Sequence, residues 1–314
     1  MTRYILEKLL SLVGVLLAIS AVVFLMIRLV PGDTVDFIFG QSMSAQRMDE
    51  IRALWGFDRP LLSQYLDWLG RLLHGDFGRS ILSGRPIGPD LLLRLPVTFE
   101  LALLAGLWSV AVGLLLGVLA ARRPYGKLDA LLTTLSLLGL ATPSFWLATL
   151  LILFLAVHLG WFPAIGFVPF AQNPIENVRS LALPALALGT TMAAAVTRMT
   201  RSAMLDVLSQ DYIRTARAKG LPAGAVLQRH ALQNAVVPVL TIIGTETGKL
   251  LGGSLIIEQI FATPGIGQYT ANSIFTRDYP VLQAAVLIVA GSYVLVNTCV
   301  DIGYAIFDPR LKYS

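Results

Sequence analysis

The sequence predicts an all-α fold, a polytopic transmembrane bundle of about six helices, and three observations lead to that prediction. Hydrophobic residues make up 55% of the 314 residues and charged residues only 14%, whereas a soluble domain carries about a quarter charged residues. The mean hydropathy is +0.71. Six apolar stretches approach the roughly 20 residues with which a helix crosses a hydrocarbon core about 30 Å thick. A large part of the surface must therefore face lipid.

The six stretches differ in how clearly they mark a span. The third contains Pro143, which indicates either a kink or the start of the apolar span proper, because an internal proline frees a backbone carbonyl. The fourth is short and alanine-rich, and hydropathy alone supports it least. Arg3 and Lys8 precede the first as in a secretory signal, but its apolar run is too long for one. The stretches are 9–27, 101–121, one within 130–157, 181–196, 235–257 and 281–307.

Lysine and arginine set the predicted orientation. If the N-terminus is cytoplasmic, most of these residues lie in cytoplasmic segments, and the two short external loops carry only Arg179 and Arg277. Lysine and arginine concentrate in the cytoplasmic loops of membrane proteins, but this bias holds only for short loops. The long segment after the first span therefore does not bear on the orientation. We therefore expect both termini to be cytoplasmic. The predicted segments are an N-terminal transmembrane helix (1–30), a small external subdomain of short helices (31–95), a core of about five transmembrane helices (96–305) containing a cytoplasmic loop (198–234), and a cytoplasmic tail (306–314).

Composition argues against several other functions. The single Cys299 allows no internal disulfide, and His74, His158 and His230 lie far apart, so the sequence predicts no metal site. The net charge is +5, but the basic residues lie beside apolar stretches, which fits topology better than nucleic-acid binding. A membrane-embedded protease would need a nucleophile with a base, or a metal cluster, within the spans. The only histidine beside a span, His158, has no carboxylate near it in the sequence.

The cytoplasmic loop contains a short basic helix. The residues after Asp211 favour a helix, and Gly220 with Pro222 ends it. At about two turns, such a helix is too short to be stable alone in water and needs a surface to pack against. That surface could be a groove on a soluble protein or the anionic lipid of the inner leaflet. The residues by themselves leave both alternatives open.

This loop resembles one in a known family. The stretch from Tyr212 to Gly220, Tyr-Ile-Arg-Thr-Ala-Arg-Ala-Lys-Gly, followed by Arg229-His-Ala-Leu-Gln-Asn-Ala-Val-Val-Pro238, is similar to the coupling loop of type I ABC importer permeases, particularly the dipeptide, oligopeptide and nickel branch. That loop's general pattern is Glu-Ala-Ala, three residues and Gly. Arg214 stands at the glutamate position and Gly220 at the glycine. A later Ile-x-Leu-Pro element is only partly met, because Gln233 stands where proline is expected.

Further motifs similar to the same branch occur in order over nearly the whole chain. They are Pro31-Gly-Asp, Gly75-Asp-Phe-Gly, Pro96-Val-Thr-Phe-Glu-Leu-Ala, Pro143-Ser-Phe-Trp-Leu-Ala, Trp161-Phe-Pro, Glu258 to Gly267, Arg277-Asp-Tyr-Pro and Asp308-Pro-Arg. The resemblance implies the type I ABC importer permease fold. It also implies a role in coupling to an ATPase for Tyr212, Arg214, Thr215, Ala216, Arg217, Ala218, Lys219 and Gly220.

The resemblance implies one half of a translocation pathway for di- or oligopeptides, working by alternating access in the bacterial inner (plasma) membrane. Nickel, a nickel chelate or glutathione are the alternative substrates. The implied partners are a second homologous permease subunit in a heterodimer, two ATP-binding subunits, an external substrate-binding protein and membrane lipid, without nucleic acid. We expect no cofactor and no enzymatic activity in this chain, because ATP and Mg belong on separate ATPase chains and it has no Gly-x-x-x-x-Gly-Lys-[Ser/Thr] loop. A stand-alone secondary transporter or channel is the remote alternative.

Two charged residues lie in the fifth stretch. Glu246 and Lys249 are spaced i, i+3 and so share one helical face. A charge at the bilayer centre costs about 2.5–3.5 kcal/mol on insertion scales, so such residues face protein or water. They could line the translocation path and meet the termini of a peptide. The alternative, which we favour, is a structural pair formed with each other or with a neighbouring subunit.

Glycines mark two further features of the C-terminal half. Gly244, Gly248 and Gly252 form a small-residue stripe at spacing four, which predicts close helix packing within the bundle or across a two-permease interface, and less readily a hinge. Gly113 and Gly117 are expected to pack in the same way. Outside the membrane, a turn leads into an amphipathic stretch and could serve as an external gate, a contact for the binding protein, or a simple surface connector. The candidate residues of that turn are Pro264, Gly265 and Gly267.

Overall fold

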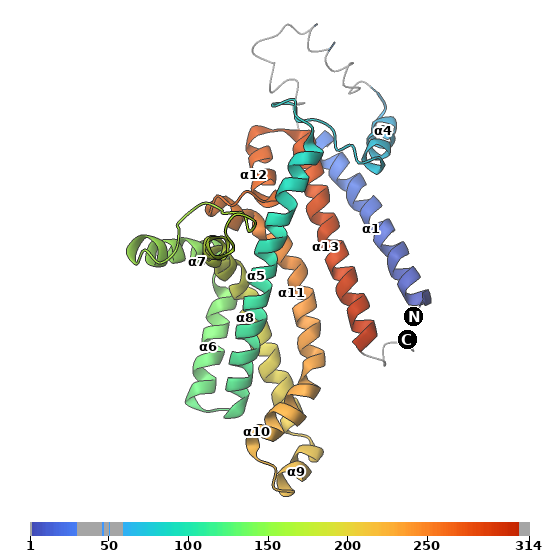
Figure 1. Ribbon diagram of the computed structural model, residues 1–314. Coiled ribbons are helices and arrows are strands. Elements are labelled where there is room, and N and C mark those ends of the chain that lie inside the picture. Colours follow the sequence, from blue (N-terminus) through green and yellow to red (C-terminus); the bar gives the residue numbers. More distant parts are fainter. Residues whose placement is uncertain (1, 30–45, 47–49, 51–58, 308–314) are drawn as a thin grey trace. The chain divides into compact units, whose positions relative to one another are not determined.

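The structure is a computed structural model that describes residues 2–29, 46, 50 and 59–307. Within these ranges the regular structure is helical, apart from one isolated bridge between Arg79 and Pro86. The chain divides into two compact units, of which one comprises 99–263 and the residues from 296 onwards, and the other 2–98 and 264–295. Figure 1 labels the helices. Of the predicted external subdomain and cytoplasmic tail, residues 31–45, 47–49, 51–58 and 308–314 lie outside the described part.

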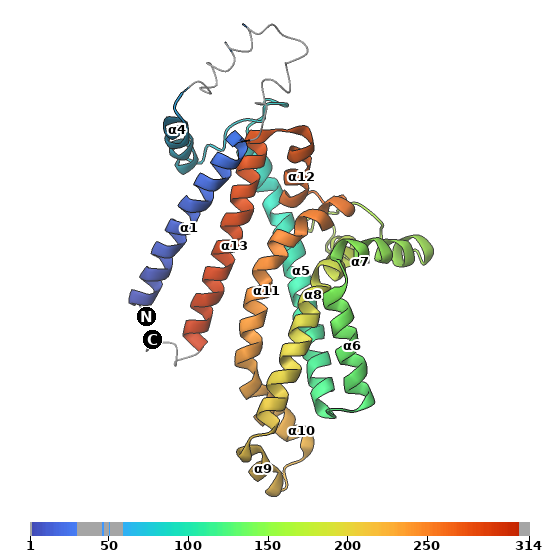
Figure 2. The same cartoon turned by 180° about the vertical axis from the view of Figure 1, so that it is seen from behind.

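The first unit is built around α8. Its elements are α5 (Ile87–Arg122) from residue 99 onwards, α6 (Lys127–Ala141), α7 (Ser144–Leu151), the π-helical segment η1 (Ile152–His158), α8 (Pro174–Leu208), α9 (Asp211–Ala218), α10 (Ala223–Ala225), the π-helical segment η2 (Val226–Leu232) and α11 (Gln233–Ile260). α6, α7 and α11 all contact α8, and Figure 2 shows α8 and α11 side by side. The alanine-rich fourth stretch is therefore a full helix of 35 residues.

Close backbone approach explains why α8 is rich in small residues. A Cβ added at Gly117 of α5 would lie 2.5 Å from the Thr200 Cβ of α8, and one at Gly113 would lie 2.6 Å from the Val196 Cβ. In return, a Cβ at Gly189 of α8 would lie 2.5 Å from the Ser109 hydroxyl. Small residues let helices approach in this way where lipid provides no hydrophobic force between them. The predicted packing role of Gly113 and Gly117 is confirmed.

The third apolar stretch is two helices and not one. α6 ends at Ala141, Thr142 and Pro143 are extended, and α7 begins at Ser144. The two helices are bent by 105° at this break, far beyond an ordinary proline kink. Proline disfavours the helical conformation of the residue before it, and it suits a helix start because its missing N–H is not needed there. Pro143 therefore both ends one helix and begins the next.

The second unit contains α1 (Thr2–Leu29), α4 (Leu61–Leu73), the first turns of α5, α12 (Ile266–Thr276) and α13 (Tyr279–Phe307) as far as residue 295. Its core joins the start of α5 to α12 and α13 through Ile87, Leu91, Ile266, Val281, Ala284 and Ala285. α4 packs on α1, where Phe24 is 2% exposed beneath the rings of Tyr65 and Trp68. α5 begins inside the range that we assigned to the external subdomain, so residues 87–95 belong to a long helix.

The predicted fold class is confirmed. Five described helices are long and apolar enough to cross a membrane, and six if the bent pair of α6 with α7 and η1 counts as one span. These helices correspond in order to the six apolar stretches of the sequence. Their apolar windows are buried to different degrees, from 18% in α1 to 72% in α8.

Candidate functional site

Two buried side chains fix the short helix α9 to the first unit. Ile213 is fully buried and Ala216 is 8% exposed, and both pack with Val226 of η2 against the last turn of α8. A helix of eight residues cannot persist by its own hydrogen bonds. The contacts with α8 and η2 therefore hold α9 in place, and η2 runs directly into α11. α9 is attached to the two longest helices that lie wholly in this unit.

Gly220 ends α9 in a left-handed conformation. Its φ is +81°, and the Leu221 N–H donates to the Ala216 carbonyl at 3.4 Å, which is the pattern of a Schellman cap. Apart from its two chain neighbours, no described residue has an atom within 4 Å of a Cβ built at Gly220. The requirement for glycine is therefore conformational and not steric, because only glycine adopts this φ without cost. The predicted end of the helix at Gly220 is confirmed.

The other described side chains of α9 are exposed. Arg214 and Asp211 form an i, i+3 ion pair at 3.5 Å with side chains 75% and 95% exposed, and exposed pairs of this kind contribute little stability. Tyr212, Thr215, Ala218, Lys219 and Gly220 are also exposed. The Arg217 side chain lies outside the described part. The residues predicted for coupling thus divide into one anchor, Ala216, and a polar exposed face. We call this exposed face the α9 outer face; it comprises Asp211, Tyr212, Arg214, Thr215, Ala218 and Lys219.

Glu246 and Lys249 are paired with each other. The Lys249 Nζ lies 2.5 Å from a Glu246 carboxylate oxygen, with the Glu246 side chain 13% exposed and the Lys249 side chain 61% exposed. Such a pair neutralises both charges within one helix. This geometry favours the structural interpretation, and a place in the translocation path stays a prediction.

The glycine stripe of α11 is not uniform. Gly244 and Gly248 are buried, whereas Gly252 is exposed and a Cβ built there would meet nothing within 4 Å. Its neighbour Gly253 instead faces Leu188 of α8, at 3.4 Å from the built Cβ. Within this chain, Gly252 therefore has no packing role among the described residues.

The turn at 264–267 is an interior element and not a surface connector. Gly265 and Gly267 are buried and Pro264 is half-buried, and the Ile266 N–H donates to the Thr98 hydroxyl at 2.9 Å. One turn further along α12, Tyr269 donates to Asp90 at 3.4 Å. Burial, followed by the charge of Asp90, raises the pKa of Tyr269 to about 12, so this hydroxyl stays a donor at neutral pH. A gating role for the turn stays a prediction.

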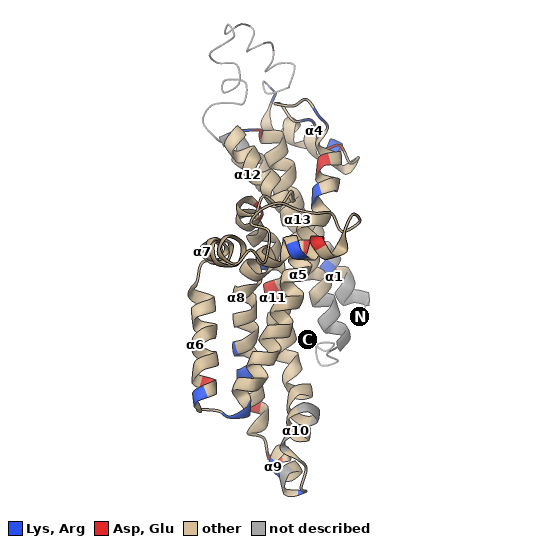
Figure 3. Ribbon diagram, turned by 60° about the vertical axis from the view of Figure 1, so that its left-hand side comes forward, with Lys and Arg blue, Asp and Glu red and all other residues tan. Residues whose placement is uncertain are grey.

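A buried ion pair between α6 and α8 was missed from the sequence. Arg201 holds Asp129 through two bonds, 2.5 Å from Nε and 2.7 Å from Nη2, and Asp129 is 4% exposed. The same carboxylate accepts from the Tyr125 N–H at 2.8 Å. Figure 3 shows charged residues gathered at these ends of α6 and α8. Because 72 residues separate the partners, no local pattern marks the pair.

A second missed contact lies in the other unit. The Asp278 carboxylate, 4% exposed, accepts from the Ser80 hydroxyl at 2.5 Å and from the Ile81 N–H at 3.3 Å. It joins the loop after α4 to the start of α13. As for metals, no group of three His, Cys, Asp or Glu side chains that could hold an ion occurs among the residues the structure describes.

Family models match most of the chain. Residues 113–313 match the model described as "Binding-protein-dependent transport system inner membrane component", and residues 1–102 match the corresponding N-terminal model. The chain belongs to this family. The resemblance that the loop motifs indicated is thereby confirmed, and this member of the binding-protein-dependent transport family is a multi-pass membrane permease subunit.

Relatives of this family member share its full length. A putative peptide transport system permease protein of Brucella abortus (strain 2308) is 44% identical over 314 residues, covering 100% of both chains. The glutathione transport system permease protein GsiC of Salmonella typhimurium is 38% identical with the same coverage. A solved inward-facing structure of the MetNI methionine ABC transporter covers 69% of this chain and 96% of its own, with a TM-score of 0.59 and 19% identity. That likeness shows the fold alone.

Proposed function

We propose that this chain is half of the pore of an ATP-driven importer that moves di- or oligopeptides across the bacterial inner membrane by alternating access. The observation that carries the proposal is the arrangement of α9, whose inner face is fixed by Ile213 and Ala216 while its outer face is mostly polar and exposed. A helix that transmits force needs this combination, with a rigid attachment on one side and a docking surface on the other.

The attachment defines how force would pass. Binding of ATP would close two separate ATPase subunits, and a groove on one of them would carry the α9 outer face with it. Since α9 packs on the end of α8 and on η2, which continues into α11, a displacement of α9 moves both long helices. ATP and Mg are bound by the ATPase subunits in this scheme, and this chain performs no chemistry.

We propose two further partners besides the ATPase subunits. They are a second, homologous permease that forms a heterodimer with this chain, and an external substrate-binding protein, with both termini of this chain in the cytoplasm. Support for the permease partner comes from Gly252, which leaves open space on α11 where another small-residue helix could approach. The family description itself names dependence on a binding protein.

The substrate proposal rests on relatives. The Brucella protein is named as a peptide transport permease and GsiC as a glutathione transport permease, and glutathione is itself a small peptide. Peptides are therefore the leading class and glutathione the second candidate.

Transport by the reconstituted complex tests the function. The permease pair, both ATPase chains and the binding protein would be placed in proteoliposomes, and uptake of a labelled peptide mixture, glutathione and nickel would be compared. We expect uptake of peptides that requires both ATP and the binding protein. Uptake by this chain alone, driven by an ion gradient, would instead identify a secondary transporter.

A further inference from the structure

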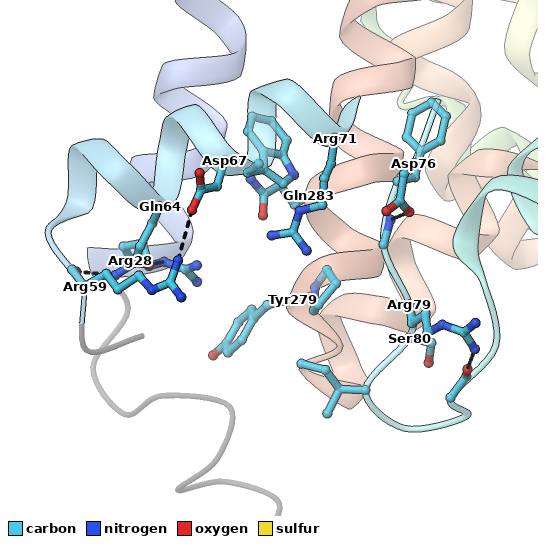
Figure 4. A pocket seen from close by; sticks show the side chains of 16 residues that line it. Arg28, Arg59, Gln64, Asp67, Arg71, Asp76, Arg79, Ser80, Tyr279 and Gln283 are labelled. Carbon is cyan, nitrogen blue, oxygen red and sulfur yellow. Dashed lines mark hydrogen bonds and ion pairs between the residues drawn. The ribbon is translucent and has the colours of Figure 1, made fainter. Parts of the chain in front are cut away.

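An arginine-lined cavity lies within the second unit. It has a volume of about 940 Å³ and is bounded by α4, the loop after α4 and the first turns of α13. Figure 4 shows Arg71 between Gln283 and Tyr279, with Arg28 and Arg59 on one side and Arg79 on the other. This volume is far larger than one bound ion needs and lies near the upper end of the range for small-molecule sites.

The cavity carries an excess of positive charge. Its walls hold four arginines and two aspartates, a difference of +2. Arg59 is paired with Asp67 at 3.2 Å, and Arg79 donates to the Gly84 carbonyl at 3.2 Å. Arg71 takes part in no ion pair among the described residues. Among the described residues, Arg71 is therefore a cation of this cavity that no carboxylate contacts directly.

A buried amide provides a second donor. Gln283 lines the cavity and is 7% exposed, and its Nε2 has no hydrogen-bond partner in the described structure. A buried donor without an acceptor costs about 1–3 kcal/mol, so a bound acceptor is expected at such a position. An uncompensated guanidinium and an unpaired amide donor together select an anion with several oxygen atoms, such as a phosphate.

The position of the cavity relative to the spans indicates the source of that anion. Arg28 follows the span Leu6–Met26 by two residues, and Tyr279 is the first residue of the span Tyr279–Val300. Both helices thus deliver their ends to the cavity, at the depth where lipid headgroups lie. Arginine side chains at this depth can form charge-assisted hydrogen bonds with the phosphate oxygens of headgroups.

The opposite face of α4 supports a lipid environment. Gln64, Trp68 and Arg71 line the cavity, whereas leucines a half-turn away form an exposed ridge: Leu62 is 69% exposed, Leu66 56% and Leu73 79%. A helix with one polar and one exposed leucine face is typical of the membrane interface. The leucine ridge would lie against acyl chains while the arginine face closes over headgroups.

We propose that this cavity binds the phosphate-bearing headgroup of an anionic phospholipid. Arg71 and the Gln283 amide hold the phosphate oxygens, and the other arginines provide the surrounding positive potential. The site shares no residue with the α9 outer face and does not depend on the transported substrate. A lipid held here would fasten α4 and the loop after it to the ends of α1 and α13.

Lipid retention by the purified complex tests the proposal. The complex would be exchanged into nanodiscs of phosphatidylcholine containing a small fraction of phosphatidylglycerol, and lipid retained after mild delipidation would be measured by mass spectrometry. The variants Arg71→Gln and Gln283→Glu are compared with Arg85→Gln, which removes an exposed arginine of the same loop that does not line the cavity. We expect wild type and Arg85→Gln to enrich phosphatidylglycerol, and each cavity variant to lower that enrichment about fivefold.

Two further measurements distinguish a lipid headgroup from other sources of the anion. Gln283→Met removes the donor without adding charge, and it should lower enrichment less than Gln283→Glu if the amide contacts an anion. Free glycerol phosphate should not displace the lipid at millimolar concentration. Equal enrichment in all variants would overturn the proposal, as would full displacement by glycerol phosphate or replacement of the lipid by an acidic peptide.

Discussion

Two ion pairs of the first unit each join an aspartate to an arginine, but they have different roles. Asp129 and Arg201 form a two-bond pair with the carboxylate 4% exposed, and Arg214 and Asp211 form a single contact at 3.5 Å in nearly full solvent. Burial decides the difference. The first pair ties α6 to α8, whereas the second contributes little to the fold and leaves its charges available for another protein.

The largest expected effect comes from breaking the buried pair. Arg201→Met leaves the Asp129 carboxylate buried without a counter-charge, and we expect a loss of about 3 kcal/mol in the free energy of unfolding, measured by denaturant titration in mixed micelles. Arg214→Met serves as the matched control, with an expected change below about 0.5 kcal/mol. The double variant Asp129→Asn with Arg201→Met should recover part of the loss, because it removes the stranded charge and keeps an acceptor for the Tyr125 N–H. Equal destabilisation by the two single variants would contradict the contrast.

Two glycines allow a similar comparison between a closely packed position and an open one. Gly117→Val places a side chain where the Thr200 Cβ would lie 2.5 Å from the new Cβ, and overpacking of this kind costs about 1–3 kcal/mol. A Cβ added at Gly252 meets no described atom within 4 Å, so we expect the isolated Gly252→Val subunit to be as stable as wild type. If a second permease packs there, Gly252→Val lowers the yield of the assembled complex in co-purification. Unchanged assembly would remove Gly252 from the proposed permease interface.

A smaller effect is expected at the end of α9. Gly220→Ala forces a residue with a Cβ to a φ of +81°, which costs about 1 kcal/mol. Gly220→Pro cannot adopt this conformation at all, because proline fixes φ near −65°. Both variants should insert normally, and ATP-dependent uptake should fall moderately in the first and be abolished in the second. Normal uptake by Gly220→Pro would show that the geometry of the cap does not matter for coupling.

The transmembrane helices were predictable because a run of about 20 apolar residues has few alternatives to a membrane-spanning helix. The end of α9 was predictable for a different reason, since glycine followed by proline is a local signal. By contrast, the short alanine-rich stretch was the span that we predicted with the least support, although 72% of the apolar window of α8 is buried. A helix that other helices surround gains more from close approach than from large side chains, so the small residues of α8 accompany its central position.

Features that depend on distant residues escaped the sequence. The partners Asp129 and Arg201 are 72 residues apart, and Asp278 and Ser80 are 198 apart. Each of these side chains resembles an ordinary terminal charge or loop residue when seen alone. The break at Pro143 was indicated, but its angle of 105° depends on how α7 packs against α8. Likewise, the sequence did not reveal that Ala216 faces inward while its neighbours form the α9 outer face.

Charge reversal on the α9 outer face tests the central claim most directly. Arg214→Glu with Lys219→Glu alters two exposed side chains without touching Ile213 or Ala216, so unfolding stability and membrane insertion should match wild type. The measurement is ATP-driven uptake by the reconstituted complex, together with co-purification of the ATPase chains. We predict loss of uptake and weakened ATPase association at unchanged stability. Wild-type uptake by this variant would contradict the account of α9 as the coupling helix.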